Sequence, residues 1–322
     1  MSRRPNTEFA GYAAAAAAAV MIATQVGSKA TRDTLFLSNF DIDALPLMLM
    51  GAAAFSIITL LWAPRLVAVW TPARMIPITF GLNGLLLVGE WALWFESPKA
   101  TSVILYLHVA ARGSFLISGF WSIINERFDP RTAKKKVGMI AGGGTLGGLL
   151  GGLLAERVAA WFTVATMLPL LAAMHLACGL MLYLARSPSD PNSPERKHRP
   201  LETKVSGSGL KILAGSPYLR NIGLFVLTTT AGATLLDYVF KARALDAYGQ
   251  GEELMRFFAV FYAAVGLGTF VLQTSLSRSL LEKLGLARTI AILPSFTALG
   301  ALPCCLCLVW RVPVWLVVAR PL

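Results

Sequence analysis

The chain has 322 residues, of which 56% are apolar and 14% are charged, and its net charge is +12. Soluble domains carry about 25% charged residues, so this chain has too little charge to cover a water-facing surface. Apolar stretches of about 20 residues alternate with short charged segments, as in a polytopic membrane protein. The composition excludes a disulfide scaffold, a coiled coil and a disordered chain. We also predict that the basic excess does not serve a nucleic-acid partner.

Nine apolar segments are each long enough to cross a hydrocarbon core of about 30 Å at 1.5 Å per residue. They lie at 9–36, 45–63, 75–95, 101–125, 137–156, 161–185, 218–244, 253–276 and 288–310. A tenth begins near Val312. Its run to Leu322 would reach only about 16 Å, so we expect nine full spans and the start of a tenth.

The longest hydrophilic segment, residues 186–209, is rich in Pro, Ser and charge, which is typical of a flexible linker, and we place the linker at 186–217. It follows six spans, so it separates an N-terminal six-helix half, 1–185, from a partial C-terminal half, 218–322. Two related six-helix halves are the layout of major-facilitator-type transporters. The expected fold is an all-α polytopic membrane protein with a major-facilitator-like six-plus-six helix bundle, incomplete after about nine and a half spans.

The cations predict how the chain is oriented. With a cytoplasmic N-terminus, 19 of the 29 Lys and Arg residues fall on the cytoplasmic side and five on the opposite side. This bias follows the positive-inside rule through all nine spans. The Ala-rich run after Arg3 and Arg4 could also be read as a secretory signal. Its apolar region continues into Lys29, however, and removing it would invert the charge alternation, so we expect it to remain as the first span.

Ionisable side chains within a span are costly unless they are paired or hydrated, so they mark candidate sites. Lys29, Arg32 and Asp33 are spaced i, i+3 and i+4, which places them on one helix face. Asp237 and Lys241 lie one turn apart in the seventh span. Two interpretations remain open: the cations line a water-filled cavity that holds an anion, or they pair internally, Lys29 with Asp33 and Asp237 with Lys241. Because intramembrane charges usually mark pathways, we favour the cavity.

The third and fourth spans contain further ionisable residues. Arg112 lies near the middle of the fourth span with His108 one turn away, Glu126 closes the inner end of that span, and Glu90 lies in the outer part of the third. Arg112 has no acidic partner within its own span, so we expect it to contact a ligand or to pair with another helix. A net-positive lining of this kind suits phosphate or carboxylate groups.

The segment 142–152 reads GGGTLGGLLGG. It contains G-x-G-x-x-G formally, but a dinucleotide site needs a preceding strand, and here the segment lies in an apolar helix. Gly143, Gly147 and Gly151 repeat every four residues, as do Gly144, Gly148 and Gly152, which favours close packing against neighbouring helices. The sequence contains no Walker A lysine, no HExxH and no G-x-S-x-G, and all four Cys lie in apolar spans. We therefore predict that the chain is not an enzyme and uses no cofactor or metal.

Three segments carry a resemblance to a known family. They are KATRDTLFLSNFDIDALP at 29–46, SGFWSIINERFDPRTAKKKVGMIAGGGTLGGLLGG at 118–152 and TLLDYVFKARA at 234–244. They resemble the ADP/ATP translocase family of plastids and intracellular bacteria, and look closer still to its major-facilitator-like relatives in free-living bacteria. The resemblance implies a bacterial inner membrane and exchange of nucleoside triphosphate for diphosphate through a cavity lined by the first, fourth and seventh helices.

The resemblance also implies roles for particular residues. Arg32 and Asp33 match the family's Lys-Asp pair, with Arg in place of Lys, and Glu126 matches the acidic position that follows Asn125. Asp237 and Lys241 match the pair in the seventh helix. Family members have twelve spans, so this chain lacks the positions of the last helices.

The sequence thus favours a secondary antiporter for a small phosphorylated anion, with a nucleotide as the suspected substrate, working by alternating access. The candidate substrate-binding residues are Lys29, Arg32, Asp33, Arg112, Glu126, Asp237 and Lys241. Two alternatives stay open: a transporter for another solute, such as an organic anion or a drug, and a truncated membrane protein that does not transport. The sequence makes no prediction of oligomeric state.

Overall fold

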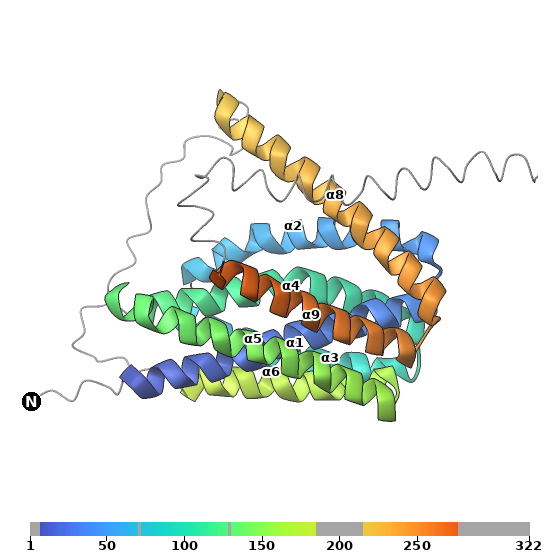
Figure 1. Ribbon diagram of the computed structural model, residues 1–322, viewed down its shortest axis with the longest axis horizontal. Helices are drawn as coiled ribbons and strands as arrows, with labels where there is room; N and C mark the ends of the chain where they lie inside the picture. The colour runs from blue at the N-terminus through green and yellow to red at the C-terminus, as the bar shows by residue number, and fades with distance from the viewer. Residues whose placement is uncertain (1–6, 70–71, 128–129, 185–214, 276–322) are drawn as a thin grey trace, which may run out of the picture.

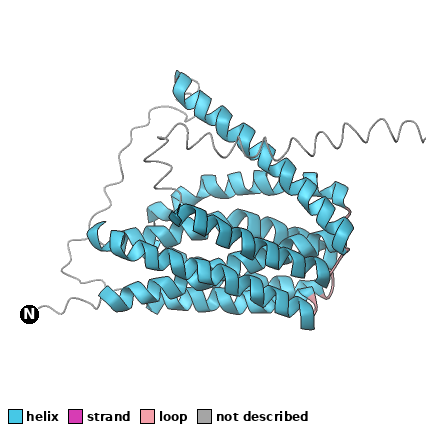
Figure 2. Cartoon of the chain, in the orientation of Figure 1, coloured by secondary structure: helices cyan, strands magenta, loops and turns pink. Residues whose placement is uncertain are grey.

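The computed structural model describes residues 7–69, 72–127, 130–184 and 215–275. Within these ranges the chain is all-α and contains no strand (Figure 2). Its long helices are α1 Thr7–Asn39, α2 Leu45–Val69, α3 Pro72–Trp94, α4 Pro98–Arg127, α5 Pro130–Trp161, α6 Met167–Leu184, α8 Pro217–Tyr248 and α9 Glu252–Ser275. Two short 3-10 helices, η1 Ile42–Ala44 and η2 Val164–Thr166, lie between them.

These eight helices are all long and apolar enough to cross a membrane. Each of the first eight expected spans corresponds to one of these helices, with ends that differ by up to seven residues. The sixth helix, α6, begins at Met167, because residues 162–166 form a turn that includes the 3-10 helix η2. The expected span 288–310, the segment from Val312 and most of the linker 186–217 lie outside the described residues.

Consecutive helices run in opposite directions (Figure 1). The start of α1 lies on the same side of the bundle as the ends of α2, α4, α6 and α9, and we call this the N-terminal side. The opposite side carries the short connections 40–44, 95–97, 162–166 and 249–251, and we call it the turn side. This alternation is the one that crossing a membrane at every helix requires.

The outer surface of the bundle is apolar. Large side chains such as Leu47, Leu85, Leu150 and Leu180 are each more than half exposed. In water, such a continuous apolar surface would promote association, whereas lipid is a good solvent for it. The surface therefore agrees with the composition in indicating a multi-pass membrane protein.

The helix α1 lies at the centre and packs against α4, α5, α6 and α9. Its closest contact is with α5, where Gly143, Gly147 and Gly151 face the backbone of α1 at Ala15, Ala19 and Ala23 respectively. Both rows repeat every four residues, so small side chains meet along the length of the two helices.

The second glycine row of α5 behaves differently along its length. Gly144 and Gly148 face the side chain of Ile22 on α1, whereas Gly152 faces Ala259 and Ala263 of α9. The expected close packing of the glycine segment is therefore present on both faces, with α1 and α9 as the two neighbours.

The helix α8 departs from the rest of the bundle. It converges with the other helices on the turn side and diverges from them toward its start at Pro217 (Figure 1). Only Lys241 and Ala244, both in its last third, are buried. The turn that follows α8 is fixed to the end of α1, because the Gln250 side-chain amide donates to the Leu37 carbonyl (3.1 Å) and the Gly251 N–H to Ser38 Oγ (3.0 Å).

Replacement of Gly147 by Ala tests the α1–α5 contact. A β-carbon at Gly147 would overlap the carbonyl of Ala19, so the helices would have to separate, at a cost of about 1–3 kcal/mol. Nothing lies within 4 Å of a β-carbon at Gly142 in the same helix. Gly142→Ala should therefore be neutral, or stabilising by about 0.5–1 kcal/mol, through helix propensity. Thermal unfolding of the detergent-solubilised protein measures both effects, and equal effects would contradict the packing described.

Candidate functional site

The structure gathers five charged side chains between α1 and α8. We call Lys29, Arg32, Asp33, Asp237 and Lys241 the ionic cluster. The three residues on α1 share one face because of their spacing, and the two on α8 lie one turn apart in the part of that helix that reaches the bundle. Two helices that are remote in the sequence thus contribute to one group of charges.

The carboxylate of Asp33 is the centre of the ionic cluster. Its Oδ1 contacts the guanidinium of Arg32 (2.9 Å) and the Nζ of Lys241 (3.2 Å). Its Oδ2 accepts a hydrogen bond of 2.7 Å from the Tyr262 hydroxyl on α9. Asp33 is 1% exposed, so these contacts replace its hydration. One carboxylate therefore connects α1, α8 and α9.

The side chain of Lys241 is fully buried and pairs with two carboxylates. Its Nζ lies 2.7 Å from Asp237 Oδ2 and 3.2 Å from Asp33 Oδ1. The pairing of Asp237 with Lys241 that the sequence suggested is present. Asp237 is partly exposed, with 32% of its side chain accessible. The contacts thus run from the buried Asp33 through Lys241 to Asp237 at the surface of α8.

Arg32, and not Lys29, pairs with Asp33. The i, i+4 spacing suggested a Lys29–Asp33 pair, but among the described residues Lys29 forms no ion pair with a carboxylate. Its Nζ lies instead 4.1 Å from the centre of the Tyr262 ring. A cation–π contact is attractive but leaves the hydrogen-bonding capacity of an ammonium group available. Lys29 therefore has donors left for another partner.

Two tyrosines that the sequence did not single out complete the ionic cluster. Tyr262 contacts Asp33 through its hydroxyl and Lys29 through its ring. The Tyr106 ring on α4 lies 4.4 Å from the guanidinium carbon of Arg32 and 5.9 Å from Lys241 Nζ. The Tyr106 hydroxyl is buried without a hydrogen-bond partner among the described residues. A buried tyrosine hydroxyl usually has a hydrogen-bond partner. A tyrosine within an apolar span was therefore the feature of the sequence that could have pointed to these two residues.

Arg112 belongs to a separate polar network. It donates a hydrogen bond of 2.7 Å to Asn83 Oδ1 on α3, and the same oxygen lies 3.0 Å from His108 Nε2. His108 Nδ1 lies 2.7 Å from Glu90 Oε1. Of the two expectations for Arg112, the structure shows contact with another helix. No hydrogen bond or ion pair among the described residues links it to the ionic cluster.

Glu126 is not brought to the ionic cluster. It lies in the last turn of α4, on the N-terminal side, and its side chain is outside the described residues. Along α4 it is roughly 30 Å from Tyr106 at 1.5 Å per residue. The candidate residues predicted from the sequence therefore fall into three places: the ionic cluster, the Arg112 network and the far end of α4.

The arrangement can bind an anion but offers no metal site in the described part of the chain. The ionic cluster has three cations and two carboxylates, which leaves one excess positive charge. Among the described residues no group of three or more His, Cys, Asp or Glu side chains could hold a metal ion. Comparisons with protein-family models, with curated proteins and with solved structures gave no match.

Replacement of Asp33 by Asn tests whether Asp33 is the centre of the ionic cluster. The change leaves Arg32 and the buried Lys241 without their shared counterion, so we expect a loss of about 3–5 kcal/mol in stability. Tyr262→Phe removes one hydrogen bond and should cost about 1.5–3 kcal/mol at most. The exposed Asp246→Asn on α8 is the matched control and should be neutral. Thermal unfolding of the three variants would contradict this ranking if Tyr262→Phe proved the most damaging.

Proposed function

We propose that the chain is a secondary transporter of phosphorylated anions, and specifically an exchanger of nucleoside triphosphate and diphosphate that works by alternating access without hydrolysis. The observation that carries the proposal is the ionic cluster, with its excess positive charge between α1 and α8. Lys29 and Arg32 supply two kinds of phosphate donor: an ammonium point charge and a planar guanidinium that can bind two oxygens. The family resemblance of the segments around these residues supports the nucleotide as substrate.

The carboxylates of the cluster suit an exchanger. Without substrate, Asp33 and Asp237 pair with Arg32 and Lys241, which makes these buried cations tolerable in the membrane. A bound phosphate would compete with Asp33 for the same cations. Because Asp33 also holds α8 and α9 to α1, this competition would weaken the contacts between these helices. Substrate binding and helix movement would then be linked through one carboxylate.

The proposed architecture is a major-facilitator-like bundle in which α1–α6 form one half and α8 and α9 begin the second. The contacts of α9 with α5 and with α1 would then be contacts between halves. The Asp33–Lys241 ion pair would cross the same interface on the turn side. Sites between two halves are where transporters of this kind bind substrate.

Counterflow measurements test the proposal. In vesicles loaded with ADP and supplied with labelled external ATP, the wild-type chain should show exchange. Lys29→Gln and Arg32→Gln should each reduce it at least tenfold, the effect of losing about 1.4 kcal/mol of binding. Lys99→Gln and Arg157→Gln, on exposed side chains outside the cluster, are the matched controls and should retain exchange.

The competing outcomes of this experiment are distinct. Exchange of a carboxylate that nucleotides do not inhibit, lost in the same two variants, would assign the site to another organic anion. The absence of all exchange in a folded protein would favour a membrane protein that does not transport. Loss of exchange in the control variants as well would show that surface charge, and not the cluster, was responsible.

We further propose that the protein lies in a bacterial inner membrane with its N-terminal side in the cytoplasm, as the cation bias predicts. Arg74 near the start of α3 and Ser97 before α4 lie on opposite sides of the bundle. With the native cysteines replaced, Ser97→Cys should react with an impermeant maleimide added outside intact cells. Arg74→Cys should react only after the cells are permeabilised. The reverse pattern would overturn the proposed orientation.

A further inference from the structure

A buried hydrogen-bonded chain connects α3 and α4 apart from the ionic cluster. It runs from Glu90 through His108 and Asn83 to Arg112, with successive distances of 2.7, 3.0 and 2.7 Å. Glu90 is 4% exposed, Asn83 2% and His108 9%. An acid and a histidine in contact within an apolar bundle are costly to maintain and commonly form proton pathways.

The hydrogen-bond donors and acceptors of this network determine how many hydrogens its side chains carry. Arg112 can only donate, so the Asn83 atom that it contacts is the amide oxygen. That oxygen also faces His108 Nε2, which must therefore carry a hydrogen. The remaining contact, between His108 Nδ1 and Glu90 Oε1, needs one more hydrogen. It lies either on Nδ1, facing a carboxylate, or on the carboxyl, facing a bare nitrogen.

The Glu90–His108 contact thus holds one removable proton. Without that proton, lone pairs of the nitrogen and of the carboxylate would face each other at 2.7 Å, and the carboxylate would keep its charge in a buried position. Glu90 Oε2 is also buried and has no hydrogen-bond partner among the described residues. Loss of the proton would therefore break the side-chain link between α3 and α4.

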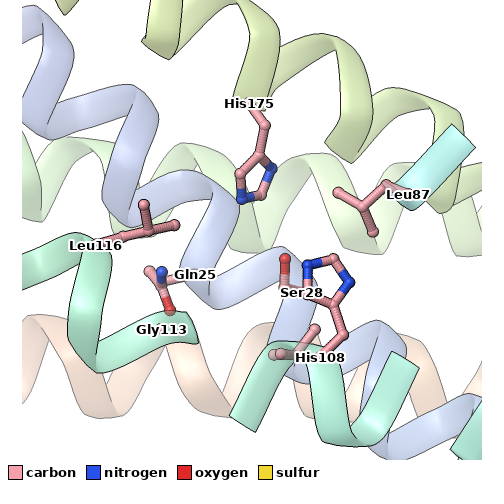
Figure 3. A pocket seen from close by; sticks show the side chains of 8 residues that line it. Gln25, Ser28, Leu87, His108, Gly113, Leu116 and His175 are labelled. Atoms are coloured by element: carbon pink, nitrogen blue, oxygen red, sulfur yellow. The ribbon is translucent and has the colours of Figure 1, made fainter. Parts of the chain in front are cut away.

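A small pocket beside His108 has room for one water. His108 and His175 of α6 line it together with Gln25 and Ser28 of α1, and both histidine rings are directed toward it (Figure 3). The volume open to water centres is about 20 Å³, and one water needs roughly 10–15 Å³ by that measure. His175 Nδ1 donates to the Leu171 carbonyl (2.9 Å) when the ring is neutral, so Nε2 is then the hydrogen-bond acceptor of that ring.

The other helices packed on α3 and α4 bring no carboxylate to this pair among their described side chains. The α6 helix contributes His175, and α1 contributes the uncharged Gln25 and Ser28. The described side chains of α2, residues 45–59, and the 3-10 helix η2 contain no ionisable group. On α5 the described ionisable side chains lie near its ends: Lys136, Glu156 and Arg157. Arg112 is the fixed charge of the network.

The pocket and the ionic cluster adjoin through two helices. On α1, Ser28 lines the pocket and the next residue, Lys29, belongs to the cluster. On α4, Tyr106 contacts the cluster two residues before His108. An anion bound at the cluster would raise the proton affinity of a nearby acid–histidine pair. By linkage, a proton on that pair would favour binding of the anion to the same extent.

We propose that Glu90 and His108 form a proton-binding site that couples transport to the movement of one proton together with the triphosphate. This inference rests on the proposed transport function. Water gives one proton to the Glu90–His108 contact before the triphosphate binds on one side of the membrane, and the contact returns that proton to water on the other side after the triphosphate leaves. The diphosphate returns with the contact deprotonated, so each exchange moves one proton in the direction of the triphosphate. The step is a proton transfer between water, imidazole and carboxylate, with no change in oxidation state.

The first experiment measures proton movement during exchange. Vesicles that contain the protein, ADP and an entrapped pH-sensitive dye receive external ATP, and labelled nucleotide is followed in parallel. Wild-type protein should acidify the interior as ATP enters. Glu90→Gln and His108→Gln should exchange nucleotide with at least tenfold less acidification. Glu156→Gln, an acid on α5 paired with Arg256 outside the network, should behave as wild type. Exchange without acidification in the wild type, or equal acidification in both variants, would overturn the proposal.

A second experiment detects the proton without any transport. Infrared difference spectra of the wild-type protein between acidic and alkaline buffer should contain carboxyl or carboxylate bands that Glu90→Gln removes and Glu156→Gln retains. Identical spectra for wild type and Glu90→Gln would overturn the proton site even if nucleotide exchange is found. Bands assigned to Glu90 in a protein without nucleotide exchange would support the proton site and refute only the nucleotide function.

Discussion

The carboxylate of Asp33 is the interaction on which the arrangement of the described helices depends. It contacts cations from α1 and α8 and a hydroxyl from α9. It is also one of the two carboxylates, with Asp237, that pair with the fully buried Lys241. The contacts of Gln250 and Gly251 with the end of α1 add neutral hydrogen bonds a few residues away. Together they hold the turn-side end of α8, which has few other contacts.

The apolar spans could be predicted because they depend on local composition. A helix in lipid must be long and apolar, and eight of the nine expected full spans correspond to described helices for that reason. The glycine rows of α5 were also readable, since a repeat of four is a helical repeat whatever the neighbour. The identity of the neighbouring helix could not be predicted. It depends on how the helices assemble, which places Gly147 against Ala19 and Gly152 against Ala259.

The candidate site was predicted in its charges but not in its pairings. Helical spacing favoured Lys29 as the partner of Asp33, because side chains four apart face each other and adjacent ones do not. The long Arg32 side chain nevertheless reaches back to its neighbour, since the Tyr106 ring lies against the guanidinium and Lys29 lies over Tyr262. Tyr262 is 229 residues from Asp33, and Asn83 lies between His108 and Arg112 only in the folded chain. No local pattern encodes such contacts.

The Glu90–His108 network and the ionic cluster connect different sets of helices. The Glu90–His108 chain connects helices within the first six spans, whereas the ionic cluster connects α1 to α8 and α9. Both are adjacent to the same stretch of α1, where Ser28 faces the pocket and Lys29 faces Tyr262. A change in charge at either group therefore changes the electrostatic field at the other. The helix α8 is held at its turn-side end and diverges from the bundle toward Pro217. A small tilt of α8 about the ion pairs at that end would therefore move its start at Pro217 the most.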